Sequence, residues 1–134
     1  MTRETLQTDE LNHPLGVFVQ AVKTPARGDL IFVSGLTSRA PDGSVVGVGD
    51  VRAQTRQILE NMKKILAKGG ATFDDIVKVT VFIRDMNDFD AIHEVRREYF
   101  TNNRPASSMV EVSRLVDEEL LIEIEAIAVV NDEE

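Results

Sequence analysis

The chain contains no cysteine and no tryptophan, and its two histidines, His13 and His93, lie far apart in the sequence. Without cysteine there can be no disulfide, no thiolate nucleophile and no cysteine–metal site. Two isolated histidines also lack the ligand spacing of a zinc site, so we expect no bound metal. These absences exclude several common kinds of catalytic centre.

Long apolar runs are absent too, since the longest have the length of a strand rather than that of a membrane-spanning helix. The N-terminal stretch MTRETLQTDELN has no apolar segment of the kind that a secretory signal needs. We therefore expect a cytoplasmic protein that does not engage a membrane.

Basic residues are outnumbered, with 15 Lys and Arg against 23 Asp and Glu and a formal net charge of −8. Phosphate binding depends on clustered Lys and Arg, so this balance argues against nucleic acid as a partner. The length of 134 residues is that of one domain with a real core, which we expect to span residues 1–134. Because residues 1–13 are polar, they are expected to be held loosely.

Apolar periodicity predicts two amphipathic helices. The first has Asp50 as its N-cap and ends at Gly69 and Gly70. The second begins at about Asn87 and keeps apolar residues on one stripe as far as Tyr99. Each helix therefore has one face suited to packing on a sheet.

Strands are predicted between and around these helices, at residues 17–24, 30–36, 75–85, 109–115 and 120–130. Residues 37–47, which hold the turn pair Asp42–Gly43, are predicted to be an excursion or a hairpin. In the strand 75–85 we expect Val77, Val79 and Val81 to share one face. The order β-β-(β)-α-β-α-β-β indicates an α+β fold, with one mixed sheet and both helices on one face.

The last predicted strand, LLIEIEAIAVV, places two carboxylates in an otherwise apolar segment. Side chains alternate between the faces of a strand, so Glu123 and Glu125 share one face. A sheet face that mixes charged and apolar residues indicates either a subunit interface with a polar pocket or a half-solvated surface.

Five sequence blocks together resemble the Rid (reactive intermediate deaminase, YjgF) family. They are FVSGL, DVRAQTRQILENMKKIL, DIVKVTVFIRDMNDFDAIHEV, RPASSMVEVSRL and IEIEAIAV. The resemblance runs from about residue 16 to residue 130. It implies a chorismate-mutase-like fold, a homotrimer with a central barrel of three sheets, and pockets between neighbouring subunits. It also implies hydrolysis of a small enamine or imine to a carbonyl compound and ammonia, with no cofactor and no metal.

The resemblance places Glu123 near the attacking water, as the acid/base group of the hydrolysis. A carboxylate in a partly apolar pocket can exchange a proton near neutrality. The alternative is a structural glutamate paired with an arginine across the interface, and Glu125 is expected to have such a structural role. Ser34 and Gly35 are expected to bind a substrate oxygen or the water through their backbone, or else simply to form a turn at the end of a strand.

Three positions depart from the family's pattern. Ser107 stands where members carry an arginine that grips the substrate carboxylate, and one hydroxyl cannot replace that bidentate charged contact. Phe18 stands where a tyrosine is usual and is expected to form an apolar wall. His93 stands where an asparagine is usual. It is either a proton donor to the departing nitrogen or a residue at the helix edge.

Two arginines are candidates for the missing carboxylate contact. Arg39 lies in TSRAPDG, a stretch that resembles the 2-aminomuconate deaminase branch, and is the preferred candidate; the alternative is an exposed loop arginine. Arg104 lies three residues before Ser107 and is the weaker candidate.

Two functions of different class follow from these features. One is an enamine or imine deaminase, with 2-aminomuconate or a 2-aminoacrylate-type imine as substrate. The other is a trimer that binds a small metabolite as a sensor or regulator without turnover. Direct RNA chemistry, an older label of the family, is disfavoured by the acidic balance.

Overall fold

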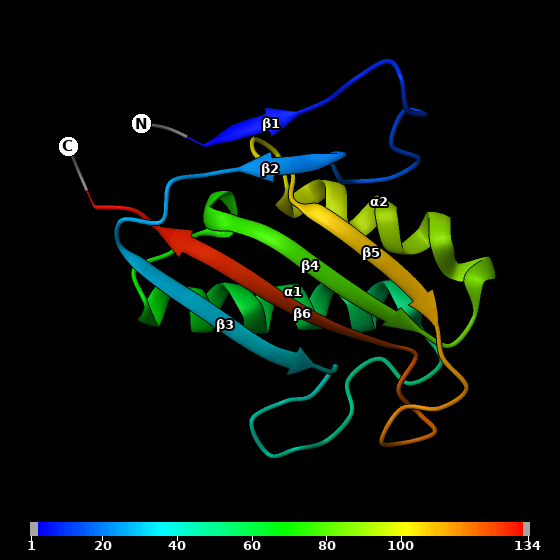
Figure 1. Ribbon diagram of the computed structural model, residues 1–134. Coiled ribbons are helices and arrows are strands. Elements are labelled where there is room, and N and C mark those ends of the chain that lie inside the picture. Colours follow the sequence, from blue (N-terminus) through cyan, green and yellow to red (C-terminus); the bar gives the residue numbers. More distant parts are fainter. Residues whose placement is uncertain (1–2, 133–134) are drawn as a thin grey trace.

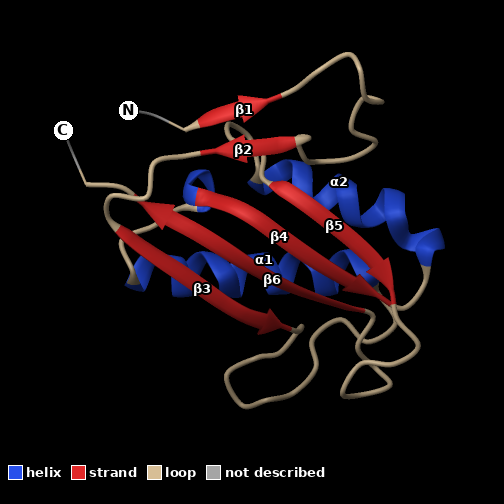
Figure 2. Cartoon of the chain, viewed as in Figure 1, coloured by secondary structure: helices blue, strands red, loops and turns tan. Residues whose placement is uncertain are grey.

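The computed structural model describes residues 3–132 and contains a four-stranded mixed sheet and two helices (Figures 1 and 2). The sheet has the order β3-β6-β4-β5, with β3 at Asp29–Leu36, β6 at Ile122–Val130, β4 at Ile76–Ile83 and β5 at Ala106–Glu111. β4 and β5 are parallel and the other pairs are antiparallel. The predicted α+β fold with one mixed sheet is confirmed.

Helix α1 covers Val51–Lys68 and helix α2 covers Phe89–Tyr99. Asp50 caps α1 as predicted, because its carboxylate accepts a hydrogen bond of 3.0 Å from the Ala53 amide. Gly69 is the C-cap, and Gly70 follows with a φ of +74°. α2 begins slightly later than predicted, because the short 3₁₀ turn Met86–Asp88 precedes it.

Both helices lie on one face of the sheet, behind the strands in Figure 1. Apolar side chains of the strands meet apolar side chains of the helices there, and this layer forms the core. Its fully buried members include Ile58, Leu59, Met62, Leu66, Val81, Ile83, Ile92, Ile122 and Ile124. Within residues 3–132, no helix is both long and apolar enough to cross a membrane.

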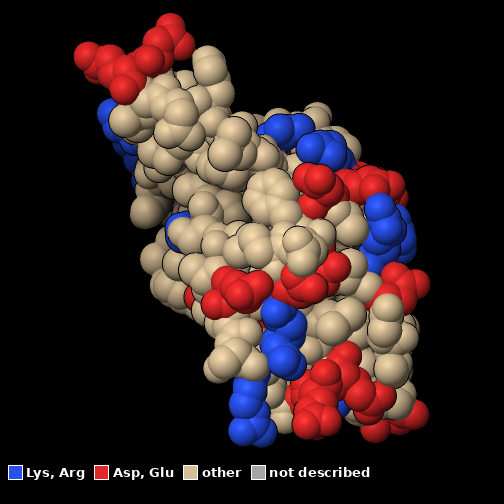
Figure 3. Space-filling model, turned by 90° about the vertical axis from the view of Figure 1, so that its right-hand side faces the viewer, with Lys and Arg blue, Asp and Glu red and all other residues tan. Residues whose placement is uncertain are grey.

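The opposite face of the sheet, here called the open face, carries a mixture of apolar and charged side chains. Its described members include Leu30, Phe32, Lys78, Thr80, Phe82, Val110, Glu123, Glu125 and Ile127. No element of the described chain covers the large apolar residues, and Phe32 is 70% exposed. Elsewhere on the surface, the view in Figure 3 shows acidic and basic side chains interspersed around an uncharged area.

The strands β5 and β4 differ from the prediction in their start and in their register, respectively. β5 starts at Ala106 rather than 109, because the parallel ladder with β4 begins at the pair Lys78–Ala106. It ends at Glu111, where β4 also ends. In β4 the register with β6 shifts between Ile76 and Lys78, so Ile76 is buried while Val77 is only half-buried. The expected shared face of Val77 with Val79 is therefore wrong.

The N-terminal part of the chain differs from the predicted long strand at 17–24. β2 covers only Ala21–Lys23 and pairs with β1, at Glu4–Leu6, in a separate two-stranded sheet. Residues 37–47 form an excursion with an isolated β-bridge between Arg39 and Val45, and further hydrogen bonds join Ser38 to Val46. This agrees with the predicted excursion or hairpin.

Two isoleucines one heptad apart on α1 test the burial of its inner face. Ile58 is fully buried, whereas Ile65 is 49% exposed. We expect Ile58→Ala to lower the free energy of unfolding by about 2–5 kcal/mol, because it leaves a cavity in the core. Ile65→Ala, the matched control, should change it by less than about 0.5 kcal/mol.

Urea unfolding of the three proteins at one protein concentration measures the difference. Equal losses for the two variants would contradict the assignment of the inner face.

Candidate functional site

Glu123 lies on the open face directly beside the backbone of Gly35. The register between β3 and β6 shifts between Val33 and Leu36, so the Ser34–Gly35 step departs from the regular ladder. A Cβ atom added at Gly35 would lie 2.2 Å from Glu123 Oε2. Only glycine allows the carboxylate to approach the backbone so closely. The structure thus brings Ser34, Gly35 and Glu123 together at the β3–β6 seam.

The Glu123 side chain is half-buried and has no partner among the residues that the structure describes. Among residues 3–132, no ion pair or hydrogen bond joins its carboxylate to another group. An arginine partner, the structural alternative, would have to come from a second molecule. Glu125 is exposed and lies in a separate shallow hollow with Lys78 and Thr80.

A second hollow, here called the edge hollow, opens where β5 meets α2 and the residues before β2. Its volume is about 240 Å³, and it is lined by Asn12, Leu15, Phe18, Phe89, His93, Ser107 and Met109. Three predicted site residues from distant parts of the sequence therefore meet: Phe18, His93 and Ser107. Most of the other lining side chains are apolar.

His93 is almost fully buried in the wall of the edge hollow. Its Nδ1 lies 2.9 Å from the Phe89 carbonyl oxygen, which can only accept, so Nδ1–H is the donor. Nε2 then carries the free lone pair, and it lies close to Gly16, where an added Cβ would be 2.1 Å away. Burial lowers the pKa of His93 below its usual value of 6.5, and Arg96 and Arg97 lower it further. The imidazole is therefore uncharged at neutral pH, whereas the predicted donor role would require prior protonation.

Arg96 lies behind Ser107 and is 1% exposed. Its Nη2 donates to the Ser107 hydroxyl oxygen at 3.3 Å and to the Val17 carbonyl oxygen at 3.2 Å. Sequence reasoning missed this residue. A helical spacing in the sequence could have revealed it, because Arg96 lies on the same stripe of α2 as Phe89 and His93. This spacing predicts a buried cation on that helix.

Glu123 and the edge hollow lie on opposite faces of the sheet. Ser107 is paired with Val79, a core residue on the helix side, and its hydroxyl contacts Arg96 of α2. Glu123 is paired with Phe82 on the open face. A single chain therefore does not bring the two groups of predicted site residues into one pocket.

The two arginines predicted to contact a carboxylate lie outside the edge hollow. Arg39 forms an ion pair with Asp117 and donates to the Gly43 carbonyl oxygen, so a ligand would compete with an existing carboxylate. The backbone carbonyl oxygen of Arg104 accepts a hydrogen bond from the Arg3 side chain. The positive charge of the Arg104 guanidinium contributes to lowering the pKa of Arg96. Neither arginine lines the hollow.

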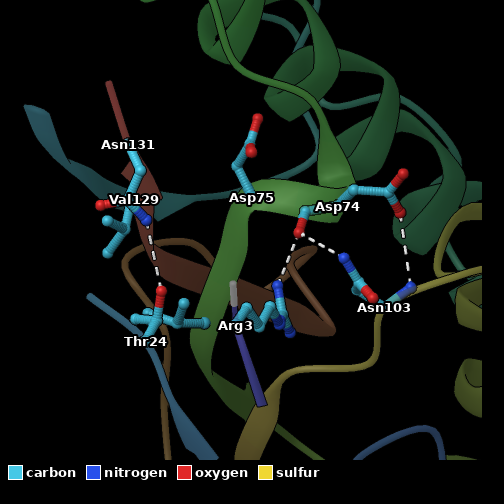
Figure 4. A pocket seen from close by; sticks show the side chains of 8 residues that line it. Arg3, Thr24, Asp74, Asp75, Asn103, Val129 and Asn131 are labelled. Carbon is cyan, nitrogen blue, oxygen red and sulfur yellow. Dashed lines mark hydrogen bonds between the residues drawn. The ribbon is translucent and has the colours of Figure 1, made fainter. Parts of the chain in front are cut away.

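A further hollow of about 430 Å³ joins the N-terminal segment to the start of β4 (Figure 4). Its polar groups bond one another: Arg3 donates to the Asp74 carbonyl at 2.6 Å, and Asn103 donates to the same oxygen at 3.2 Å. We interpret these contacts as structural. Within residues 3–132, no group of three or more acidic or histidine side chains is placed to hold a metal ion.

The fold and these sites define a class of small α+β proteins with a sheet covered by helices on one face only. The chain belongs to the family described as endoribonuclease L-PSP, matched over residues 9–130, which includes the Rid, YjgF and RutC proteins. A RutC family protein of Pyrococcus abyssi is 43% identical over 128 residues, covering 96% of this chain and 98% of the relative. The 3-aminoacrylate deaminase RutC of Acinetobacter baylyi is 38% identical, covering 96% and 98%.

Solved structures show the same fold. The Rid family protein YyfB of Yersinia pestis matches with a TM-score of 0.88 at 30% identity, covering 97% of this chain and 100% of that one. TdcF of E. coli, solved with bound serine, matches with a TM-score of 0.71 at 37% identity, covering 96% and 99%. Membership of the family, predicted from five sequence blocks, is confirmed.

The family's description as endoribonuclease finds little support in the charges of this chain. Its net charge is −8, and on the face drawn in Figure 3 basic side chains are interspersed with acidic ones. Binding of a phosphate backbone uses a continuous basic surface, and that face has none.

The lowered pKa of His93 predicts a pH-dependent stability. The unfolded chain takes up a proton at His93 near pH 6.5, whereas the folded chain takes it up only at lower pH. The contribution of neutral His93 to the free energy of unfolding is therefore fully present above pH 6.5. It is lost as the pH falls through the pKa that His93 has in the folded protein. We expect the difference in melting temperature between pH 7.5 and pH 5.5 to become smaller in His93→Asn.

The control is His13→Asn, because the His13 side chain is 84% exposed. This variant should keep the pH dependence of the parent protein. A His93→Asn protein with an unchanged pH dependence would contradict the assignment.

Proposed function

We propose that this protein hydrolyses a small enamine or imine to a carbonyl compound and ammonia. The observation that carries the proposal is the half-buried Glu123 carboxylate, which lies against Gly35 and is unpaired within residues 3–132. The 3-aminoacrylate deaminase RutC, 38% identical over nearly the whole length, supports this class of reaction. Binding of serine to TdcF supports a small-molecule ligand for the pocket.

The proposed reaction uses Glu123 as a proton acceptor and donor. An enamine first takes up a proton on carbon to give the iminium form. Water then adds to the carbon of the C=N bond while the carboxylate accepts a proton from the water. The carboxylic acid returns that proton to the nitrogen of the resulting carbinolamine, ammonia leaves, and the hydroxyl releases its proton as the carbonyl forms, which balances the proton first taken up. The backbone at Ser34 and Gly35 is placed beside the carboxylate and is proposed to hold the water or a substrate oxygen. The steps need no cofactor.

The proposal includes a homotrimer whose three sheets meet at their open faces to form a barrel. Exposed apolar residues on this face, such as Phe32 and Val110, support burial against further copies. In this arrangement Glu123 of one copy and the edge hollow of its neighbour, with Phe18 and His93, form one pocket. A joint pocket would unite groups that lie on opposite faces of a single sheet.

The substrate panel follows from the resemblance and from the relatives. It contains 2-aminomuconate, 2-aminoacrylate and 3-aminoacrylate, each generated in the assay by an enzyme that releases it. The alternative function, a sensor or regulator, would show binding of a metabolite without turnover.

Glu123→Gln tests the proposed chemistry, because the amide has nearly the same shape but cannot accept a proton from water. We expect ammonia release above the uncatalysed rate to fall by at least about 100-fold. Glu125→Gln, two residues along the same strand, is the matched control and should retain activity. Ammonia is measured by a coupled glutamate dehydrogenase assay, and the size of each variant is checked by light scattering.

Absence of ammonia release by the parent protein from every substrate of the panel would contradict the proposed function. A ligand that raises the melting temperature without being turned over would then favour the sensor. Full activity of Glu123→Gln would remove Glu123 from the mechanism.

Phe32→Glu tests the proposed assembly. Placing a carboxylate on an apolar part of the open face should dissociate the trimer, because an unpaired charge is costly to bury. Val116→Glu is the control, since Val116 is 78% exposed in the loop after β5 and lies outside the open face. Native mass spectrometry should show a trimer for the parent and for Val116→Glu, and smaller species for Phe32→Glu. A monomeric parent would contradict the assembly.

A further inference from the structure

The buried guanidinium of Arg96 is only partly satisfied. Nη2 donates to the Val17 carbonyl oxygen and to the Ser107 hydroxyl oxygen, at 3.2 and 3.3 Å. Nη1 is also buried and has no hydrogen-bond partner in the described chain. An orphaned buried donor is costly, and few natural proteins keep one without a reason.

The charge of Arg96 has no counter-ion either. Among residues 3–132, no carboxylate forms an ion pair with it, and burial together with the nearby Arg104 lowers its pKa to about 10. The guanidinium therefore remains protonated at neutral pH. Its Cζ lies 5.8 Å from the centroid of the Phe100 ring, a contact that compensates only part of the lost hydration. A buried cation in this state favours an anion from outside the chain.

The contacts of Arg96 lead to the edge hollow. Ser107 lines the hollow, and so does Phe18, the residue after Val17. Because the arginine N–H occupies a lone pair of the Ser107 oxygen, the serine O–H is free to donate toward the hollow. A ligand oxygen bonded to that hydroxyl would lie next to a positive charge.

We propose that Arg96 takes over the charge that the family's arginine supplies where Ser107 stands. In this arrangement Arg96 is a positioning residue, and the Ser107 hydroxyl is the direct donor to the carboxylate of a small molecule in the edge hollow. The apolar walls formed by Phe18, Phe89 and Met109 suit a short carbon chain beside that carboxylate. The identification of this molecule with the enamine or imine substrate rests on the proposed function. The binding of a carboxylate in the edge hollow does not depend on that function.

Unreactive probes separate binding from turnover. Butyrate and butyramide have nearly the same shape, and only butyrate is charged at pH 7.5. Titration of the full-length protein, followed by ligand-observed NMR, should show saturable binding of butyrate and much weaker binding of butyramide. Parent protein that binds neither probe, or both equally, would overturn the proposal.

Arg96→Met removes the charge and keeps an unbranched apolar side chain that replaces the stem of the arginine. We expect butyrate binding to weaken by about 10- to 100-fold, as for loss of a charge-assisted hydrogen bond, and butyramide binding to stay unchanged. A purely structural arginine would instead change both probes equally. The melting temperature should hold or rise, since an apolar replacement of a buried charge is often neutral or stabilising.

Arg97→Met is the matched control, because it removes the same charge from the next, exposed position of α2. It should bind butyrate as the parent does. Arg96→Lys keeps the charge and should retain part of the preference for butyrate. Ser107→Ala removes the direct donor and should weaken butyrate binding by about 3- to 10-fold.

Two further results would overturn the assignment to Arg96. One is undiminished butyrate binding by Arg96→Met. The other is loss of that binding in Arg104→Met but not in Arg96→Met. If the butyrate results hold while no member of the substrate panel releases ammonia, the proposed function fails and the carboxylate site stands.

Discussion

Two helices cover only one face of the four-stranded sheet, and the other face has to meet solvent or a second molecule. Strands β4 and β6 alternate accordingly, with Val81 and Ile124 toward the helices and Phe82 and Glu123 away from them. This one-sided burial places the predicted catalytic carboxylate on the uncovered face. It also explains why the predicted site residues of a single chain form two separate groups.

Three ionisable side chains mark the two groups: Glu123 is half-buried, and His93 and Arg96 are buried. Glu123 is unpaired beside Gly35, His93 is kept neutral by burial, and Arg96 keeps a charge without a counter-ion among the described residues. The burial of His93 and Arg96 is unfavourable for an isolated domain, because charged and polar groups lose hydration when they are withdrawn from water. Ionisable groups in such surroundings concentrate at functional sites. Binding of a charged small molecule, and association of copies, would satisfy the groups that a single chain leaves without partners.

Local physical signals predicted much of this fold and part of its site. Asp50 as a cap and Gly70 as a stop act within one turn of the helix, so α1 could be placed closely from the sequence. The glutamates of β6 were likewise assigned to one face by the two-residue period of a strand. The start of β5 was misplaced, because its pairing with β4 depends on a partner strand, and the bulge near Val77 was missed for the same reason.

The sequence by itself determined the two amphipathic helices, the alternation of the central strands, the absence of cysteine and the acidic net charge, since these depend only on residue type and local spacing. Only the tertiary structure decided which distant residues meet. Arg96 reaches Ser107 because α2 packs beside β5, and the edge hollow forms where the segment before β2 closes over both. Such contacts join residues that no local periodicity relates, and they set the burial that keeps His93 neutral and leaves Arg96 charged without a counter-ion in the described part of the chain.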